Sequence, residues 1–181
     1  PKLLQFEQVS PGEGYLYTIV GHHAHHHKGK YLSMTSYERY MHAYGWIEPY
    51  TVFLSDTRVN HSTATSEWHF KWHNGLVRMV GRNTRGPDNE GLALYKQGSE
   101  LKVAIANGYH QHYWNVTYKG ETLHGSERFQ IAFGCNFAGA ADGTCEGEGN
   151  EIVAYGPNSK SLRLDNSRYN SPDASWWERG P

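Results

Sequence analysis

The stretch SEWHFKWH, residues 66–73, indicates the fold class because large aromatic and polar residues alternate along it without a break. Trp68, Phe70 and Trp72 fall on one face, and charged or imidazole side chains occupy the other face. Successive side chains of an extended strand point to opposite faces, so this period of two indicates a half-buried antiparallel strand. The segment is therefore predicted to be one strand of an all-β protein.

Nine further strand-like segments surround this one, each bounded by turn residues. Their spacing is typical of a sandwich or barrel, and KQGSE at 96–100 predicts a hairpin turn. No internal repeat is visible in the sequence. We expect an antiparallel β-sandwich with at most one or two short helices. The other predicted strands are residues 14–21, 50–56, 75–82, 91–98, 100–108, 112–120, 128–135, 150–156 and 161–165.

The domain organisation is predicted to be simple. One β-sandwich domain spans residues 1–181, with residues 1–49 as a candidate N-terminal extension and residues 166–181 as an irregular tail. One helix is predicted over residues 37–44, because Ser36 is a good N-terminal cap and a glycine follows the segment.

The composition limits the classes of function. Only 38% of the residues are hydrophobic, while 13 Tyr, 6 Trp and 20 Gly are typical of a turn-rich β protein. A formal net charge of -1 excludes strong long-range attraction to nucleic acid, so no nucleic-acid partner is expected. No apolar run reaches the length of a membrane span.

Two features favour secretion. Cys135 and Cys145 flank a loop rich in Gly and Ala, which favours a disulfide over the alternative of two free thiols. The triplets NHS at 60–62 and NVT at 115–117 are N-glycosylation sequons. An extracellular location is expected, with a cytoplasmic location, as for some fungal lectins, as the alternative.

A histidine-rich run, HHAHHHKGKY, occupies residues 22–31. Neutral imidazoles this close together can bind zinc, nickel or copper, but a specific site needs fixed geometry. The favoured interpretation is a solvated loop, with a metal site or a pH-sensitive contact as alternatives, and no cofactor is expected. The candidate metal ligands are His22, His23, His25, His26 and His27.

The stretch ANGYHQHYWNVTYKG, residues 106–120, carries the main candidate binding site because it contains two His and four large aromatic residues. Trp114 is predicted to face inward, and Tyr113, Asn115 and Thr117 are predicted to face outward. A ring beside an amide and a hydroxyl suits contact with a sugar. The alternative is an aromatic cross-strand stack that binds nothing.

Two other groups of residues could carry chemistry. Arg82 and Arg85, in the polar stretch 81–91, could clamp an anionic or hydroxylated ligand, although local ion pairs are the favoured interpretation. An enzyme of the polysaccharide lyase class would need a positioned acid and base. Its candidate residues are Tyr109, His110, His112, Tyr113 and Arg128.

The central segment resembles two related families, the fungal fruit-body lectins and the sea-anemone actinoporins. The actinoporin likeness lies in YWNVTYKG (113–120), GLALYKQGSELKVAI (91–105) and NTRGP (83–87), and the lectin likeness in LKVAIANGYHQHYWNVT (101–117) and WHF (68–70). The resemblance covers about residues 65–135. It implies a compact β-sandwich that binds either a glycan or a lipid headgroup.

The resemblance also implies site residues. Tyr113 and Trp114 stand where actinoporins have Trp, while Phe129 and Phe133 stand where they have Tyr, without the hydroxyl. Gly134 replaces a further Tyr. By position, Asn115 and Thr117 match the acid and the hydroxyl that hold an N-acetylated sugar in the fungal lectins.

The predicted function is therefore non-catalytic carbohydrate binding. The first alternative is a membrane-binding, pore-forming cytolysin, but Pro11, Gly12 and Gly14 argue against the long N-terminal helix of actinoporins. The partner is a glycan or a membrane headgroup, and a homo-oligomer would supply avidity. The expected ligand-binding residues are Tyr109, His112, Tyr113, Trp114, Asn115, Thr117, Phe129, Phe133, Arg82 and Arg85.

Overall fold

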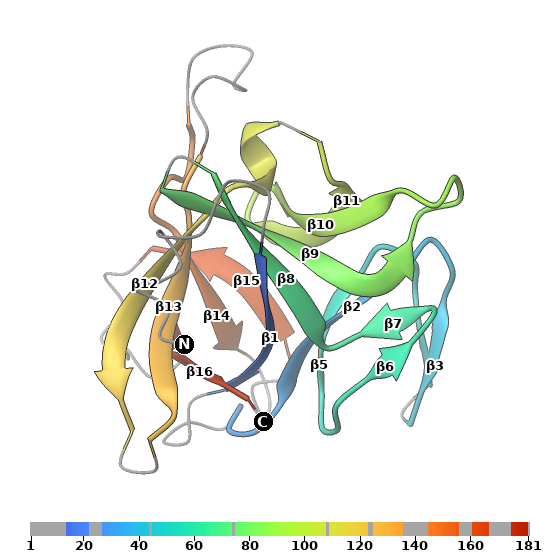
Figure 1. Cartoon of the computed structure of the whole chain (residues 1–181), viewed down its shortest axis with the longest axis horizontal. Helices are drawn as coiled ribbons and strands as arrows, with labels where there is room; N and C mark the ends of the chain where they lie inside the picture. Colours follow the sequence, from blue (N-terminus) through green and yellow to red (C-terminus); the bar gives the residue numbers. More distant parts are fainter. Residues whose placement is uncertain are drawn as a thin grey trace.

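The protein is nearly all β, and its antiparallel sheets pack together, as predicted (Figure 1). This computed structural model describes residues 14–21, 27–43, 45–73, 75–107, 109–122, 125–135, 145–155, 161–166 and 175–180. Each of the ten predicted strand segments contains an observed strand.

Six strands close into a ring. Each pairs antiparallel with two neighbours in the order β1–β8–β9–β12–β13–β16, and β16 returns to β1. The closed ring adds a barrel to the predicted packing of antiparallel sheets. The ring strands are β1 (Gly14–Gly21), β8 (Glu67–His73), β9 (Leu76–Arg85), β12 (Trp114–Glu121), β13 (Glu127–Phe133) and β16 (Trp177–Arg179).

Three hairpins cover one end of this barrel. They are β2 (Tyr31–Thr35) with β5 (Val52–Ser55), β10 (Gly91–Gln97) with β11 (Glu100–Ile105), and β14 (Glu151–Tyr155) with β15 (Ser161–Asp165). The hairpins contact one another, since the amide of Val103 donates to the carbonyl of Tyr50 and the amide of Leu164 to that of Ser99. A four-strand unit is thus used three times, which is the topology of a β-trefoil.

One tryptophan of each unit ties its fourth strand to its second strand. Each of the three is fully buried, and each indole N–H donates to a backbone carbonyl, as a buried donor must. Trp68 Nε1 bonds the Leu32 oxygen (2.9 Å), Trp114 Nε1 the Leu94 oxygen (3.2 Å), and Trp177 Nε1 the Ile152 oxygen (3.1 Å). The threefold repeat is not visible in the sequence, but the same indole hydrogen bond recurs in each of the three units.

Glycine faces two of these tryptophans across the junction between units. Gly21 pairs with Trp177, and Gly81 pairs with Trp68. A Cβ at Gly21 would collide with the backbone of His27, and a Cβ at Gly81 would collide with Met34. A larger residue at Gly21 would push the neighbouring backbone away from the barrel, whereas at Gly81 the end of the Met34 side chain would have to move.

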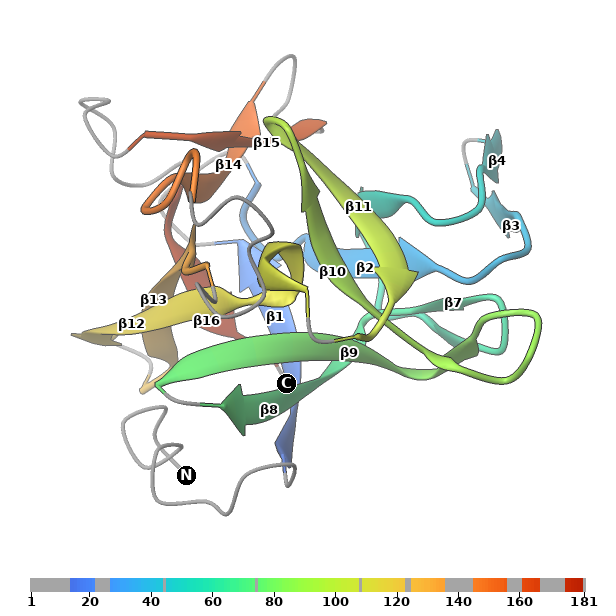
Figure 2. The same ribbon diagram turned by 90° about the horizontal axis from the view of Figure 1, so that it is seen from above.

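The helix predicted over residues 37–44 is wrong. The chain there forms β3 (Tyr40–His42) and β4 (Gly45–Ile47), a separate two-stranded sheet that projects at the right-hand edge of Figure 2. The rings of Tyr40 and His42 both pack on Phe53, with ring centroids 6.4 and 5.8 Å apart. Two rings two residues apart share a face only in an extended strand, so this contact selects strand over helix.

Three further short elements were also missed. They are β6 (Asn60–His61), β7 (Ala64–Thr65) and the 3₁₀ turn η2 (His110–His112). In addition, β1 and β2 lie inside the region taken as a candidate extension, and β16 replaces part of the irregular tail. The pairing of β16 with both β1 and β13 closes the barrel.

The three units differ at the residue two positions before each tryptophan. Ser66 and Ser175 fill this buried position in the first and third units, and His112 fills it in the second. Burial lowers the pKa of His112 to about 4, with Arg78 adding to the effect, while the nearby carbonyls of Leu94 and Ile105 oppose it. The imidazole is therefore neutral in the folded protein at pH 7.

Replacing Trp114 tests the role of the indole bonds. Trp114→Phe should lower the free energy of unfolding by about 2–4 kcal/mol, because it removes buried ring volume and leaves the Leu94 carbonyl without its donor. Urea denaturation followed by circular dichroism measures the change. Tyr109→Phe is the control, since Tyr109 is 61% exposed. Equal stability of the Trp114 variant and the parent would contradict this role.

The neutral state of His112 predicts a pH dependence. Its folded pKa lies below the usual value near 6.5, so unfolding takes up a proton as pH falls through this window. Stability should fall by on the order of 3 kcal/mol between about pH 6.5 and pH 4 and then level off for this group. His112→Ser, which installs the residue of the other two units, should show a shallower loss in urea titrations. Parallel pH curves for variant and parent would rule out this contribution.

Candidate functional site

The aromatic segment that the sequence favoured as a binding surface lies mostly in the core. Trp114 and Phe129 are fully buried, Phe133 is 1% exposed and Tyr113 is 4% exposed. Trp114 pairs with Phe133, and their rings meet edge-on at 6.0 Å inside the barrel. The expectation that Tyr113 faces outward is wrong, because its ring is buried 5.4 Å from the ring of His73.

Three expected residues of this segment remain on the surface. Asn115 and Thr117 are exposed on the outer wall of β12, as their alternation with Trp114 predicted. Tyr109 is exposed on the loop before η2. His112 is fully buried below that loop, 5.1 Å from the ring of Tyr95. The closing of the barrel thus separates these polar groups from the aromatic residues.

Arg82 forms a local ion pair with a buried carboxylate. Its Nη1 pairs with Oε2 of the buried Glu67 at 2.8 Å, and Arg58 pairs with the other carboxylate oxygen at 2.5 Å. Burial raises the pKa of Glu67, but the hydrogen bonds from the two arginines outweigh it and hold the pKa below its usual range. The local ion pair was the favoured interpretation for Arg82, and it is confirmed. Arg85 lies exposed at the end of β9.

One histidine of the histidine-rich run is structural. His27 is fully buried, its Nε2 lies 3.0 Å from the carbonyl oxygen of Trp176, and its ring packs edge-on against Trp177. His22, His23, His25 and His26 lie outside the described residues. Within the part of the chain that the structure describes, no group of three His, Cys, Asp or Glu could hold a metal ion.

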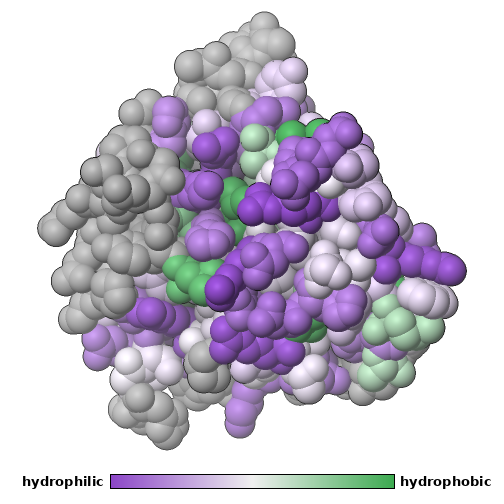
Figure 3. Space-filling view, turned by 45° about the vertical axis from the view of Figure 1, so that its right-hand side comes forward, coloured by the Kyte–Doolittle hydropathy of each residue, from purple (hydrophilic) through white to green (hydrophobic). Residues whose placement is uncertain are grey.

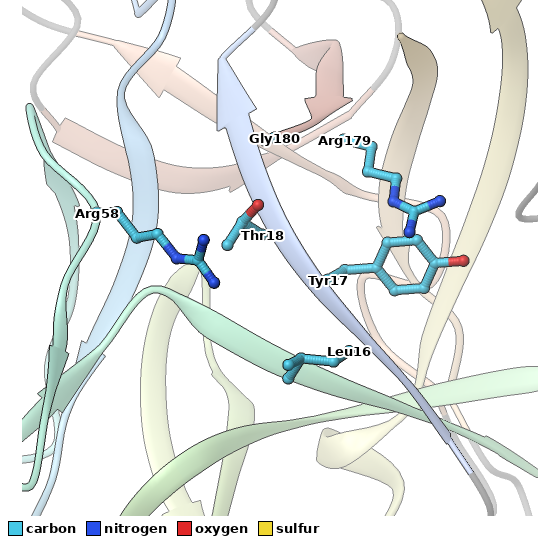
Figure 4. Close-up of a pocket in the computed structure, with 6 residues that line it drawn as sticks. All are labelled: Leu16, Tyr17, Thr18, Arg58, Arg179 and Gly180. Carbon is cyan, nitrogen blue, oxygen red and sulfur yellow. The ribbon is translucent and has the colours of Figure 1, made fainter. Parts of the chain in front are cut away.

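A pocket of about 150 Å³ opens beside β1, as Figure 4 shows. Arg58 and Arg179 approach it from opposite sides of β1, with Thr18 between them. The guanidinium of Arg179 lies 4.6 Å above the centre of the Tyr17 ring, so the ring holds the arginine in place. The remaining lining residues are Leu16 and Gly180.

A second pocket, of about 470 Å³, shares Arg179 and Gly180 with the first and is also lined by Gly125, Ser126 and Glu127. We call the two together the mouth pocket, because they lie at the barrel end away from the hairpins. In the antiparallel pairing of β13 with β16, the backbone of Arg128 lies opposite that of Glu178, and the backbone of Phe129 lies opposite that of Trp177. The same register, continued by one residue, places Glu127 opposite Arg179.

The mouth pocket combines an acceptor with donors. Glu127 is 8% exposed, and its Oε2 has no hydrogen-bond partner among the described residues. The Arg179 guanidinium, which also lines the pocket, stacks on the Tyr17 ring. A buried carboxylate oxygen without a donor is costly, so a ligand hydroxyl that donated to it would be stabilised.

Sequence reasoning missed Glu127, Arg58 and Arg179. A signal was present in two of the three cases, since Glu127 and Arg179 each stand two residues from a core aromatic, Phe129 and Trp177. A charged residue that is two positions from an inward-facing aromatic residue, at the end of the same strand, lies at the rim of a barrel. The sequence around Arg58 contains no comparable pattern that would predict its contact with Glu67.

The predicted disulfide is present between Cys135 and Cys145. A disulfide is compatible with an extracellular protein. Among the described residues, no helix has the length and apolar character needed to cross a bilayer.

Several solved structures share this fold. The crystal structure of Cry35Ab1 matches with a TM-score of 0.56 and 12% identity, over 96% of this chain and 37% of that chain. The structure of a mosquitocidal holotoxin matches with a TM-score of 0.53 and 13% identity, over 92% of this chain and 17% of that chain. The chain thus spans well under two thirds of either neighbour, and identities this low show the fold alone. No family model and no curated protein sequence matches the chain.

Proposed function

We propose that the protein binds a carbohydrate in the mouth pocket without transforming it. The observation that carries this proposal is the buried Glu127, whose Oε2 has no hydrogen-bond partner among the described residues and which lines a pocket together with Arg179. Sugar hydroxyls both donate and accept hydrogen bonds, so one hydroxyl suits the carboxylate and a neighbouring hydroxyl suits the guanidinium.

The size and lining of the pocket support a small hydroxylated ligand. A volume of about 470 Å³ lies in the range of pockets for small molecules, and barrel mouths are frequent ligand sites. Ser126 and Thr18 add hydroxyl groups at the rim. Because the pocket is shallow, we expect modest affinity per site, with avidity from several sites or from an oligomer.

A role within a toxin is the second candidate. One matching structure is a mosquitocidal holotoxin, in which the matched region is 17% of the chain. We propose on this ground that the protein is the glycan-binding part of a secreted toxin. Release of dye from sphingomyelin vesicles would instead favour a pore former, and unsaturated-uronate absorbance on alginate would favour a lyase.

Two substitutions in the mouth pocket test the proposal. Glu127→Gln and Arg179→Lys should each weaken binding of a glycan identified on an array by about 10–100-fold, since a hydrogen bond to a charged group contributes about 1.5–3 kcal/mol. Arg179→Lys keeps the charge and removes the planar fork. Isothermal titration calorimetry measures the dissociation constants.

The control is Glu146→Gln, which makes the same change at an exposed position outside the pocket. It should bind as the parent does. An array without a hit for the parent protein, or full affinity of Glu127→Gln, would exclude this function for the mouth pocket.

A further inference from the structure

The outer wall of the barrel carries a cationic face on β8 and β9. Lys71 and Arg78 are directly opposite each other in the register of the two strands. The adjacent pair, Phe70 and Met79, is fully buried in the core, so Lys71 and Arg78 point outward. The cationic face is defined as His69, Lys71, Arg78, Arg82 and Arg85.

The face contains little compensating negative charge. Lys71 and Arg78 are half-buried, and among the described residues neither forms an ion pair with a carboxylate. The buried Nε of Arg78 has no hydrogen-bond partner in that part of the chain. Glu67 is the acidic residue of β8, and its two carboxylate oxygens form ion pairs with Arg58 and Arg82.

Arg85 is the last residue of β9, and its side chain reaches back along the strand. Its Nη1 lies 3.3 Å from the position that a Cβ on Gly91 would take, and that position is 3.6 Å from Val80. Val80 is opposite His69, so the guanidinium folds back toward the imidazole. Burial lowers the pKa of His69, and the charges of Lys71, Arg82 and Arg85 lower it further.

This arrangement is unfavourable in the free protein. Like charges directly opposite on neighbouring strands destabilise a sheet, and partial burial strengthens the repulsion because water screens it less. His69 lies on the same face, and its lowered pKa favours the neutral imidazole, so it adds little positive charge. An anion bound between Lys71 and Arg78 would remove the repulsion.

We propose that the cationic face binds an anionic polysaccharide, sulfated or rich in uronic acid. The cations are spread over two neighbouring strands rather than gathered around one point, which suits an extended chain better than a single anion. The site is separate from the mouth pocket, and the proposal does not rest on the proposed function.

Other extended anions fit the face less well. The exposed large apolar side chains of the described residues are Tyr37, Met41, Trp46, Ile105, Tyr109 and Tyr155, and none lies on β8 or β9. The face thus offers no ring for stacking nucleic-acid bases and no anchor for a bilayer. In the view of Figure 3, hydrophilic residues cover much of the coloured surface, and hydrophobic residues form separate smaller areas.

Heparin is the probe for this proposal. The parent should bind a heparin oligosaccharide in a titration at low salt, and the affinity should fall as salt is raised. Lys71→Gln with Arg78→Gln should weaken binding at least 10-fold and raise the melting temperature of the free protein, because the like-charge pair is gone. The control, Lys28→Gln with Lys119→Gln, changes the net charge equally at exposed positions away from the face and should bind normally.

Three further measurements keep the proposal open to refutation. Arg85→Gln, at an exposed strand end, should also weaken heparin binding without affecting folding. Glu127→Gln should bind heparin as the parent does, which separates this site from the mouth pocket. Single-stranded DNA and phosphatidylserine vesicles should bind more weakly than heparin. Equal affinity for DNA, no heparin binding by the parent, or equal losses in the control pair would overturn the proposal.

Discussion

The three indole hydrogen bonds are the constraint on which the rest of the structure depends. A tryptophan N–H that is fully buried must find an acceptor, and in each unit it finds a carbonyl of the second strand. Each bond fixes a hairpin against the barrel wall, because the acceptor strand belongs to the hairpin and the donor strand belongs to the barrel. Ring closure, hairpin placement and the filled core follow from this repeated contact.

The same constraint decides where polar chemistry can lie. Once the rings of Trp68, Trp114 and Trp177 fill the barrel near the hairpins, that end has no space for a ligand. Inward positions at the far end are filled by Glu127 and Arg179 instead. Charged groups cannot be packed deep in a core without partners, so the far end stays open and polar. The high aromatic content is thus used for packing, and the candidate binding chemistry lies at the rim and on the outer wall.

Much of the local structure could be predicted from the sequence, because strand periodicity is a local signal. The alternation at Trp68, Phe70 and Trp72 and the outward position of Asn115 and Thr117 are properties of a few consecutive residues. The helix expected over 37–44 failed for a tertiary reason, since its rings pack on Phe53 from a strand outside the segment. Local capping signals are easily outweighed by such packing.

The candidate site could not be predicted, because it is built from distant residues. Glu127 and Arg179 meet only through the register of β13 and β16, and Arg58 reaches Glu67 from a different loop. A ring-rich strand such as β12 gives no local sign of whether its aromatic residues face a barrel interior or solvent. The closure of the barrel decides this, and closure depends on β16, which the sequence did not reveal as a strand.

The differences between the three units explain why binding features fall at their junctions. In the first and third units, the serine two residues before the tryptophan bonds a strand of the same unit, through the 2.8 Å bond between Ser33 and Ser66 and the 2.9 Å bond between Gln130 and Ser175. Where strands of different units meet, the three junctions have antiparallel backbone pairing in common, but their side chains differ from one junction to the next. The mouth pocket joins the third unit to the first, and the cationic face joins the first to the second. A threefold framework held by its tryptophans can therefore carry a different surface at each junction without loss of the fold.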